Sequence, residues 1–184
     1  MSSPIADRLR RLRRERELTI DALASRAGVS RSMISLIERG ESSPTANILD
    51  KLAAALGVTL ASLFAGAAPV SPLSRRAAQP EWTDPETGYR RRNLSPPGFP
   101  SRLELVEVVL QPGMRVTYDT ATREPAFDQQ VWLIEGQLLL TVGTDRHELA
   151  EGDCLAMRLD RPTTFHNPGQ RPSRHLVALC PAAP

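Results

Sequence analysis

The sequence predicts an α + β protein of two domains, in which five short helices precede an all-β barrel. Apolar residues recur at helical spacing over residues 5–64. From residue 102 onward, short β-rich runs alternate with turn residues, and a stretch rich in Pro, Ala, Gly and Arg lies between the two patterns. We therefore divide the chain into a helical domain (1–65), a linker (66–80) and a β domain (81–184).

Each of the five helices is predicted from an apolar face. The apolar positions are Ile5, Leu9 and Leu12, then Leu23, Ala24 and Ala27, then Ile34 and Ile37, then Ile48, Leu49, Leu52 and Leu56, then Leu60, Leu63 and Phe64. A hydroxyl side chain that can cap a helix precedes each of the last four, namely Thr19, Ser30, Thr45 and Thr59. Glycines stand where three of the helices should end, at Gly28, Gly40 and Gly57.

Eight short strands are predicted in the β domain. They are "RLELVEVVL", "RVTYD", "QVWLIEG", "QLLLTVG", "HELAEGD", "CLAMRL", "TTFHN" and "RHLVALC", separated by turns such as "QPG", "GTD" and "NPG". Regular spacing of this kind is typical of a sandwich or a barrel. Trp82 and Tyr89 are too apolar for a free tether, so we expect the residues after 80 to pack on the β domain.

Composition narrows the class of protein. No apolar run approaches the roughly 20 residues of a membrane helix, and no apolar stretch follows the Arg-rich start, so we expect a cytoplasmic protein without membrane contact. Residues 1–65 carry ten Lys/Arg against seven Asp/Glu, and the basic residues concentrate in "RLRRLRRERE" (8–17). Cys154 and Cys180 lack metal-site spacing and are expected to be buried free thiols.

The stretch "LTIDALASRAGVSRSMISLIERG" predicts a helix-turn-helix. Two helices of about eight residues flank a turn that contains a glycine. With Val29, Ile34 and Ile37 in the core, the outward positions of the second helix hold Arg31, Ser32, Ser35 and Leu36. A helix presented in this way fits the major groove of DNA, and Ser30 at its start leaves backbone N–H groups for phosphate.

Residues 5–64 resemble the lambda-repressor-like helix-turn-helix domain of the Xre family of regulators. The resemblance rests on the frame "GVSRSMISLIERG…SP…L…LAAALGV…LF". It implies that Thr19 touches phosphate, that Arg31, Ser32, Ser35 and Leu36 face the bases, and that Arg39 and Asn47 lie near the DNA backbone. It also implies a structural ion pair between Arg13 and Glu38.

Two positions depart from the Xre pattern. Ile20 and Leu36 stand where many members have glutamine, and Leu36 can contact a thymine methyl but cannot form a hydrogen bond. For Arg31 two interpretations remain open, a bidentate guanine contact that discriminates by about 1–3 kcal/mol or a phosphate contact alone.

Residues 102–182 resemble a cupin, a small jelly-roll barrel, through "PG" at 112–113, "QVWLIEGQLLLTVG" and "AEGDCLAMRLDRPTTFHNPG". Metal-binding cupins hold iron, manganese or nickel with three histidines and a carboxylate. Here the paired-histidine region is "TREP" (122–125), the carboxylate position is Gln129 and the last histidine position is Thr163. We therefore expect no metal, no cofactor and no enzymatic activity.

Since no metal site is expected in the β domain, we expect it to bind a small molecule in a pocket between its strands. Strand alternation sends Val131 and Leu133 inward and Trp132 outward, where Trp132 and Ile134 suggest a subunit interface. The expected pocket residues are Tyr118, Glu124, Gln129, Thr163, Phe165 and Asn167. A filled core without ligand is the alternative.

Together these features predict a sequence-specific DNA-binding regulator, by default a repressor. The expected partners are double-stranded DNA with a palindromic operator, a second copy of the chain, and an unknown small-molecule effector. Two alternatives remain: the cupin as a dimerisation clamp without effector, or a metal-dependent cupin enzyme that carries a DNA-binding appendage.

Overall fold

The helical domain contains four α-helices and one 3-10 turn. The computed structural model describes residues 4–64, 71–119 and 126–182. The helical elements are α1 (Pro4–Glu15), α2 (Ile20–Ala27), α3 (Arg31–Arg39), α4 (Ala46–Ala55) and the 3-10 turn η1 (Ala61–Phe64). The prediction of a fifth α-helix is therefore wrong. Leu60 and Leu63 are three residues apart, a spacing that one turn of a 3-10 helix satisfies as well as an α-helix does.

The starts of three helices follow the predicted capping residues. The hydroxyls of Thr19, Ser30 and Thr45 accept backbone N–H groups from Ala22 (3.0 Å), Met33 (3.2 Å) and Ile48 (3.5 Å). Each of these bonds satisfies a donor that has no partner inside its helix. The apolar faces then meet in one core, whose fully buried members include Leu9, Leu23, Ile34, Leu49 and Leu52.

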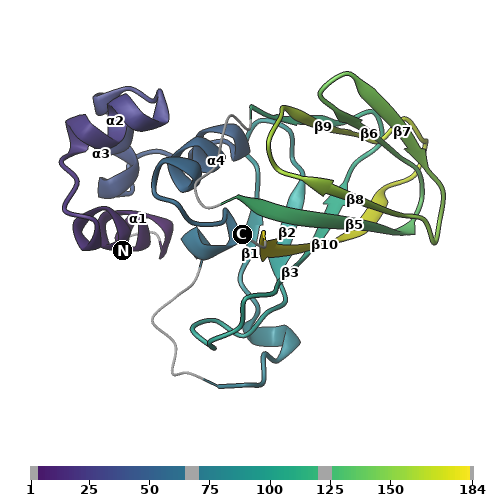
Figure 1. The fold of residues 1–184 in the computed structure, drawn as a ribbon, viewed down its shortest axis with the longest axis horizontal. Coiled ribbons are helices and arrows are strands. Elements are labelled where there is room, and N and C mark those ends of the chain that lie inside the picture. The colour runs from purple at the N-terminus through teal and green to yellow at the C-terminus, as the bar shows by residue number, and fades with distance from the viewer. Residues whose placement is uncertain (1–3, 65–70, 120–125, 183–184) are drawn as a thin grey trace.

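The β domain consists of two antiparallel sheets that face each other (Figure 1). The strands are β1 (Glu81–Thr83), β2 (Arg90–Asn93), β3 (Glu104–Leu110), β4 (Arg115–Tyr118), β5 (Phe127–Glu135), β6 (Leu138–Val142), β7 (Asp145–Leu149), β8 (Cys154–Arg158), β9 (Thr163–His166) and β10 (Ser173–Pro181). One sheet has the order β1-β2-β3-β10-β5-β8 and the other β4-β9-β6-β7.

The predicted closed barrel is wrong, because the sheets keep free edges. β1 and β8 end the six-stranded sheet, and β4 and β7 end the four-stranded sheet. Alternation of inward and outward residues is the same in a sandwich and a barrel, so the sequence pattern did not separate the two. All eight predicted strands are present, and β1 and β2 are two further strands in the segment that was expected only to pack on the domain.

The predicted linker of residues 66–80 falls partly outside the described residues, at 66–70. Its described part contains one short 3-10 turn, η2 (Arg76–Ala78), and is largely exposed. The domain boundaries at 65 and 81 stay predictions.

No helix in the described ranges is long and apolar enough to cross a membrane.

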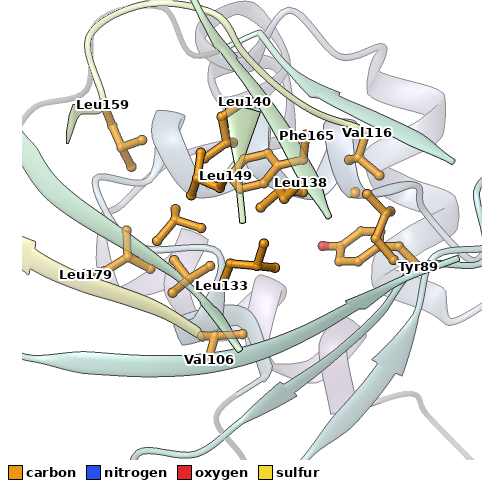
Figure 2. Close-up of a cluster of buried hydrophobic side chains, with 14 of the residues drawn as sticks. Tyr89, Val106, Val116, Leu133, Leu138, Leu140, Leu149, Leu159, Phe165 and Leu179 are labelled. Atoms are coloured by element: carbon orange, nitrogen blue, oxygen red, sulfur yellow. The ribbon is translucent and has the colours of Figure 1, made fainter. Parts of the chain in front are cut away.

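The core of the β domain lies between the two sheets (Figure 2). Val131 and Leu133 are fully buried, as alternation along β5 predicted, while Trp132 is 47% exposed. The cysteine prediction is wrong for Cys154, which is exposed on the edge strand β8; Cys180 is half-buried, and both thiols are free.

The helical domain is docked against the β domain through α4 and η1. Figure 1 shows α4 between the β sheets and the more distant α2 and α3. The Asn93 side chain donates to the Ala61 carbonyl at 2.9 Å, and Ser62 donates to Glu104 at 3.3 Å. Phe64 packs against Trp82 with ring centroids 5.6 Å apart. The two predicted domains thus share a mixed polar and aromatic interface.

Asp84 supplies a charged contact in this interface. Its carboxylate is buried and accepts the Ala46 N–H, at the first residue of α4, at 3.1 Å. Negative charge at the amino end of a helix is stabilising, and the same carboxylate also accepts the Thr87 hydroxyl at 2.5 Å.

We expect Asp84→Ala to lower the free energy of unfolding by about 1–3 kcal/mol, because the Ala46 N–H loses its partner while buried. Urea unfolding measures the loss, and hydrogen exchange at the Ala46 amide should become faster. The matched control is Asp145→Ala on the exposed strand β7, which should leave both quantities unchanged. Equal behaviour of the two variants would contradict this role of Asp84.

Candidate functional site

Helices α2 and α3 form a helix-turn-helix whose turn depends on Gly28. Gly28 has φ +61°, in the left-handed region, and its N–H donates to the end of α2 at Ala24. Val29 follows and is buried, which anchors the turn in the core. On α3, Ile34 and Ile37 are buried, so the opposite side of the helix faces outward. Figure 1 shows that α3 lies on the side of the helical domain away from the β sheets.

The predicted base-facing residues lie on this outward side to different degrees. Arg31 and Ser32 are exposed in the first turn of α3, whereas Ser35 and Leu36 are half-buried. The Arg31 side chain is 71% exposed and lies 3.4 Å from the Asp21 carboxylate on α2. A weak, solvated ion pair of this kind can hold the guanidinium near the groove and release it to a guanine or a phosphate.

Other predicted DNA contacts already have partners inside the protein. Thr19 is exposed, and its hydroxyl caps α2. Arg39 is exposed and donates to Glu41 (2.7 and 2.8 Å) and to Ser35 (2.5 Å).

Asn47 is half-buried, and its side-chain oxygen is buried without a hydrogen-bond partner among the described residues. Ser30 is exposed and its hydroxyl caps α3. The DNA roles of all these residues stay predictions.

The structure places Arg13 and Glu38 in a bidentate ion pair inside the helical domain. Arg13 donates to the two Glu38 oxygens at 2.7 and 2.8 Å, and to the Leu18 carbonyl at 2.9 Å. Glu38 is 4% exposed, and Arg10 adds a longer contact at 3.7 Å. This pairing raises the pKa of Arg13 further and ties α1 to the end of the recognition helix.

A second candidate site is a cavity of about 70 Å³ inside the β domain, at its contact with the helical domain. Most of its wall is apolar and includes Val106, Val116, Leu159, Phe165, Val177 and Leu179. Figure 2 shows Val106, Val116, Leu159, Phe165 and Leu179 converging between the sheets, with the Tyr89 hydroxyl directed toward the interior. Asp50 from α4, with Thr59 and Leu60 before η1, completes the wall. The cavity therefore belongs to both domains.

Four of the six predicted pocket residues line this cavity: Tyr118, Gln129, Thr163 and Phe165. Glu124 lies outside the described residues. Asn167 does not line the cavity, although strand parity predicted it would. Its side chain donates to the Leu110 and Arg171 carbonyls (2.9 and 2.8 Å) and accepts the Gly169 N–H (2.9 Å), so it is consumed in holding the loop after β9.

The sequence reasoning missed the charged and aromatic side of the cavity. Arg91 and Tyr89 come from β2 and the turn before it, and His175 comes from β10. Alternation gave no signal for Arg91, because Arg91, Arg92 and Asn93 are all buried in β2. His175 is buried and stacked on Phe165, with ring centroids 5.6 Å apart.

The cavity keeps its phenols neutral. Tyr89 and Tyr118 share a hydrogen bond of 2.8 Å between their hydroxyls. Burial raises the pKa of both side chains, and the positive charge of Arg91 opposes this increase. One hydroxyl donates to the other, so the pair keeps one free O–H donor at neutral pH.

Burial lowers the pKa of His175 to about 3, from 6.5 in an exposed side chain. Between these values the unfolded chain binds a proton that the folded chain does not. The contribution of His175 to stability is therefore complete above pH 6.5 and is lost as the pH falls toward 3, with a slope of about 1.4 kcal/mol per pH unit.

We expect His175→Gln to remove this slope in urea unfolding series between about pH 4 and pH 7. His147→Gln, on β7 and half-exposed, should keep the pH dependence of the unchanged protein. A His175→Gln variant whose stability still falls as steeply with decreasing pH would show that another group carries the effect.

The side chains that line the cavity do not fit the metal centre of metal-binding cupins, which needs three histidines and a carboxylate. The two described ligand positions hold the neutral side chains of Gln129 and Thr163, and His175 is the one imidazole in the lining. Within the described ranges, no three His, Cys, Asp or Glu residues are grouped so that they could hold a metal ion.

Comparison with known proteins relates the chain to helix-turn-helix transcriptional regulators. Residues 9–63 match the helix-turn-helix family model HTH_3. The chain is 28% identical over 164 residues to the HTH-type transcriptional regulator SutR of Escherichia coli (strain K12), covering 89% of this chain and 86% of SutR.

Two further matches cover different parts of the molecule. An uncharacterized HTH-type transcriptional regulator, y4dJ of Sinorhizobium fredii (strain NBRC 101917 / NGR234), is 41% identical over 59 residues, which span 32% of this chain and 77% of y4dJ. The crystal structure of an HTH_3 family transcriptional regulator from Vibrio cholerae superposes with a TM-score of 0.80 at 25% identity, covering 99% of this chain and 97% of that one.

Proposed function

Because this chain belongs to the Xre-type helix-turn-helix family of transcriptional regulators, we propose that it is a ligand-responsive repressor that binds a palindromic operator as a homodimer. The helix-turn-helix binds DNA, and the cupin-like β domain is attached to it as a regulatory part. One observation carries the ligand response: the cavity has walls from both domains, so its occupant contacts the DNA-binding domain directly.

The exposed start of α3 supports sequence reading. Arg31 and Ser32 are exposed in the first turn of α3, and α3 lies on the side of the helical domain away from the β sheets, where a duplex has access. In a two-fold dimer the two recognition helices would enter successive major grooves about 34 Å apart. Occupancy of such an operator blocks transcription if it overlaps a promoter, which makes repression the proposed outcome.

The outer face of β5 and β8 supports pairing of two chains. Trp132 is 47% exposed on β5 and lies opposite the exposed Cys154 on the edge strand β8. The unpaired edge of β8, with the Trp132 side chain beside it, offers a surface on which a second chain can pair. We place the dimer contact there.

We also propose that the β domain senses its ligand without converting it. Gln129 and Thr163 replace a carboxylate and a histidine with neutral groups, and no Lewis acid is needed for binding alone. A pure dimerisation clamp is the competing function, and the small volume of the cavity, about 70 Å³, is the observation that favours it.

The first test is a native mass spectrum of the full chain, together with selection of its DNA site from random duplexes. We expect a dimer and a two-fold symmetric site with half-sites about one helical turn apart. Extra small-molecule mass that disappears on denaturation would support the sensor, and a bare dimer would support the clamp. A monomer bound to an asymmetric site would contradict the proposed dimeric repressor.

A further inference from the structure

Two buried polar groups in the cavity have no partner among the described residues. They are the Nε of Arg91 and the Nδ1 of His175, in side chains that are 6% and 1% exposed. A buried polar atom without a hydrogen bond destabilises the fold, and an occupant of the cavity that hydrogen-bonds to it removes this penalty. Both residues line the same cavity, although they come from different strands, β2 and β10. Each residue therefore offers an unused polar atom to an occupant of this cavity.

The charge at this point is positive. A guanidinium stays protonated even when buried. The neighbouring Arg92 is paired with Glu81 and Glu107, whereas no ion pair to Arg91 is found in the described part of the chain. Arg91 lies over the Phe64 ring, 5.3 Å from its centroid, which partly compensates the charge from one side. Asp50 of α4 also lines the cavity and is engaged in an interaction within the protein.

The other groups favour an acceptor with an apolar body. His175 is neutral at physiological pH and can donate one hydrogen bond. Of the Tyr89 and Tyr118 hydroxyls, one donates to the other, and the second can donate to a ligand. Around them the wall is formed by valine, leucine and phenylalanine side chains. A carboxylate is the common anionic group that matches a guanidinium, and an alkyl chain matches the rest of the wall.

We propose that the cavity binds a short-chain monocarboxylic acid, with its carboxylate at Arg91 and its alkyl chain against the apolar wall. The proposal rests on the sensor function above and adds the chemical class of the ligand. A cavity of about 70 Å³ is smaller than the roughly 150 Å³ cavity that accepts benzene, so the acid has only a few carbon atoms while the domains stay docked. A longer acid displaces the wall formed by Thr59 and Leu60, and with it the DNA-binding domain.

The test compares acids with their amides, which have nearly the same shape but no charge. Thermal unfolding of the full chain is followed with propionate and butyrate, and with propionamide and butyramide, at matched ionic strength. We expect the acids to raise the Tm by about 3–6 °C at ten times their Kd, and the amides to leave it unchanged. Equal shifts with acid and amide, or no shift with either acid, overturn the proposal.

Variants locate the binding group. Arg91→Met should abolish the shift, because it removes the guanidinium and keeps an apolar side chain of similar length. Arg91→Lys keeps the charge and should keep part of the shift. Arg90→Met removes an equal charge from the exposed neighbour on β2 and should keep the full shift. A full shift in Arg91→Met overturns the proposal.

Operator binding separates this proposal from the proposed function. If the acids bind through Arg91 but leave the affinity for the selected operator unchanged, the acid site stands and the sensor function fails. If the operator is bound and no acid raises the Tm, the DNA-binding function stands and the acid site is overturned.

Discussion

Replacing Arg31 by alanine is expected to weaken binding to the selected operator about tenfold or more, while the fold and the dimer stay intact. The Arg31 side chain is 71% exposed, and its contact with Asp21 at 3.4 Å is solvated. Little folding free energy therefore depends on it, whereas a bidentate contact to guanine is lost entirely. Fluorescence anisotropy with the operator and with a site altered at one base pair measures both affinity and discrimination.

The two interpretations of Arg31 give different results in this assay. A guanine contact predicts that Arg31→Ala binds the altered and unaltered sites equally, and a phosphate contact predicts the same weakening on every sequence. Arg146→Ala, on the exposed face of β7, removes the same charge far from α3 and should not change the affinity. Unchanged binding by Arg31→Ala would mean that α3 does not enter the groove.

Removing Glu38 is expected to have the largest effect on stability. Glu38→Ala leaves the Arg13 guanidinium without the two hydrogen bonds of 2.7 and 2.8 Å that it now makes, in a part of the core where Glu38 is 4% exposed. Breaking a buried ion pair by removal of one partner costs about 3–5 kcal/mol. Urea unfolding should show this loss, accompanied by weaker operator binding because the end of α3 loses its tie to α1.

Two controls separate the buried charge from other effects. Glu41→Ala breaks the exposed pair with Arg39 and should leave the stability unchanged. The double variant Arg13→Met, Glu38→Met removes both charges and should recover much of the stability, because no isolated charge remains in the interior. A Glu38→Ala loss no larger than that of Glu41→Ala would refute the assigned importance of the pair.

The features of the fold that the sequence predicted correctly are those that depend on neighbouring residues, such as helix starts and strand faces. The capping hydroxyls at Thr19, Ser30 and Thr45 mark the starts of α2, α3 and α4, and alternation along "QVWLIEG" orients β5 correctly. The fifth helix and the closed barrel were wrong for a common reason. Both depend on how a segment continues in space. One turn of apolar spacing fits a 3-10 turn as well as an α-helix, and a row of alternating strands fits an open sandwich as well as a closed barrel.

Some residues of the candidate sites could be identified from the sequence and others could not. The resemblances placed Arg31, Gln129 and Thr163, since motif positions in one chain segment survive in the sequence. Arg91 and Asp50 were not predicted as site residues because they reach the cavity only when β2 joins β3 and α4 docks on the β domain. Contacts made between distant segments leave no periodic pattern in the sequence. Asn167 failed for a different reason: its side chain is buried, but its hydrogen bonds go to the Leu110 and Arg171 carbonyls and not to the cavity.

The Asp84 carboxylate at the start of α4 has a consequence for protein engineering. Helix-turn-helix readers are commonly regarded as transplantable modules, but here one helix of the reader is completed by a residue 38 positions further along the chain. A chimera that joins residues 4–64 to a foreign sensor would leave the Ala46 N–H without its acceptor and Phe64 without Trp82. A graft that also carries the β1–β2 turn would keep both, so the natural cut for a portable reader lies after Asn93 and not at the end of the last helix.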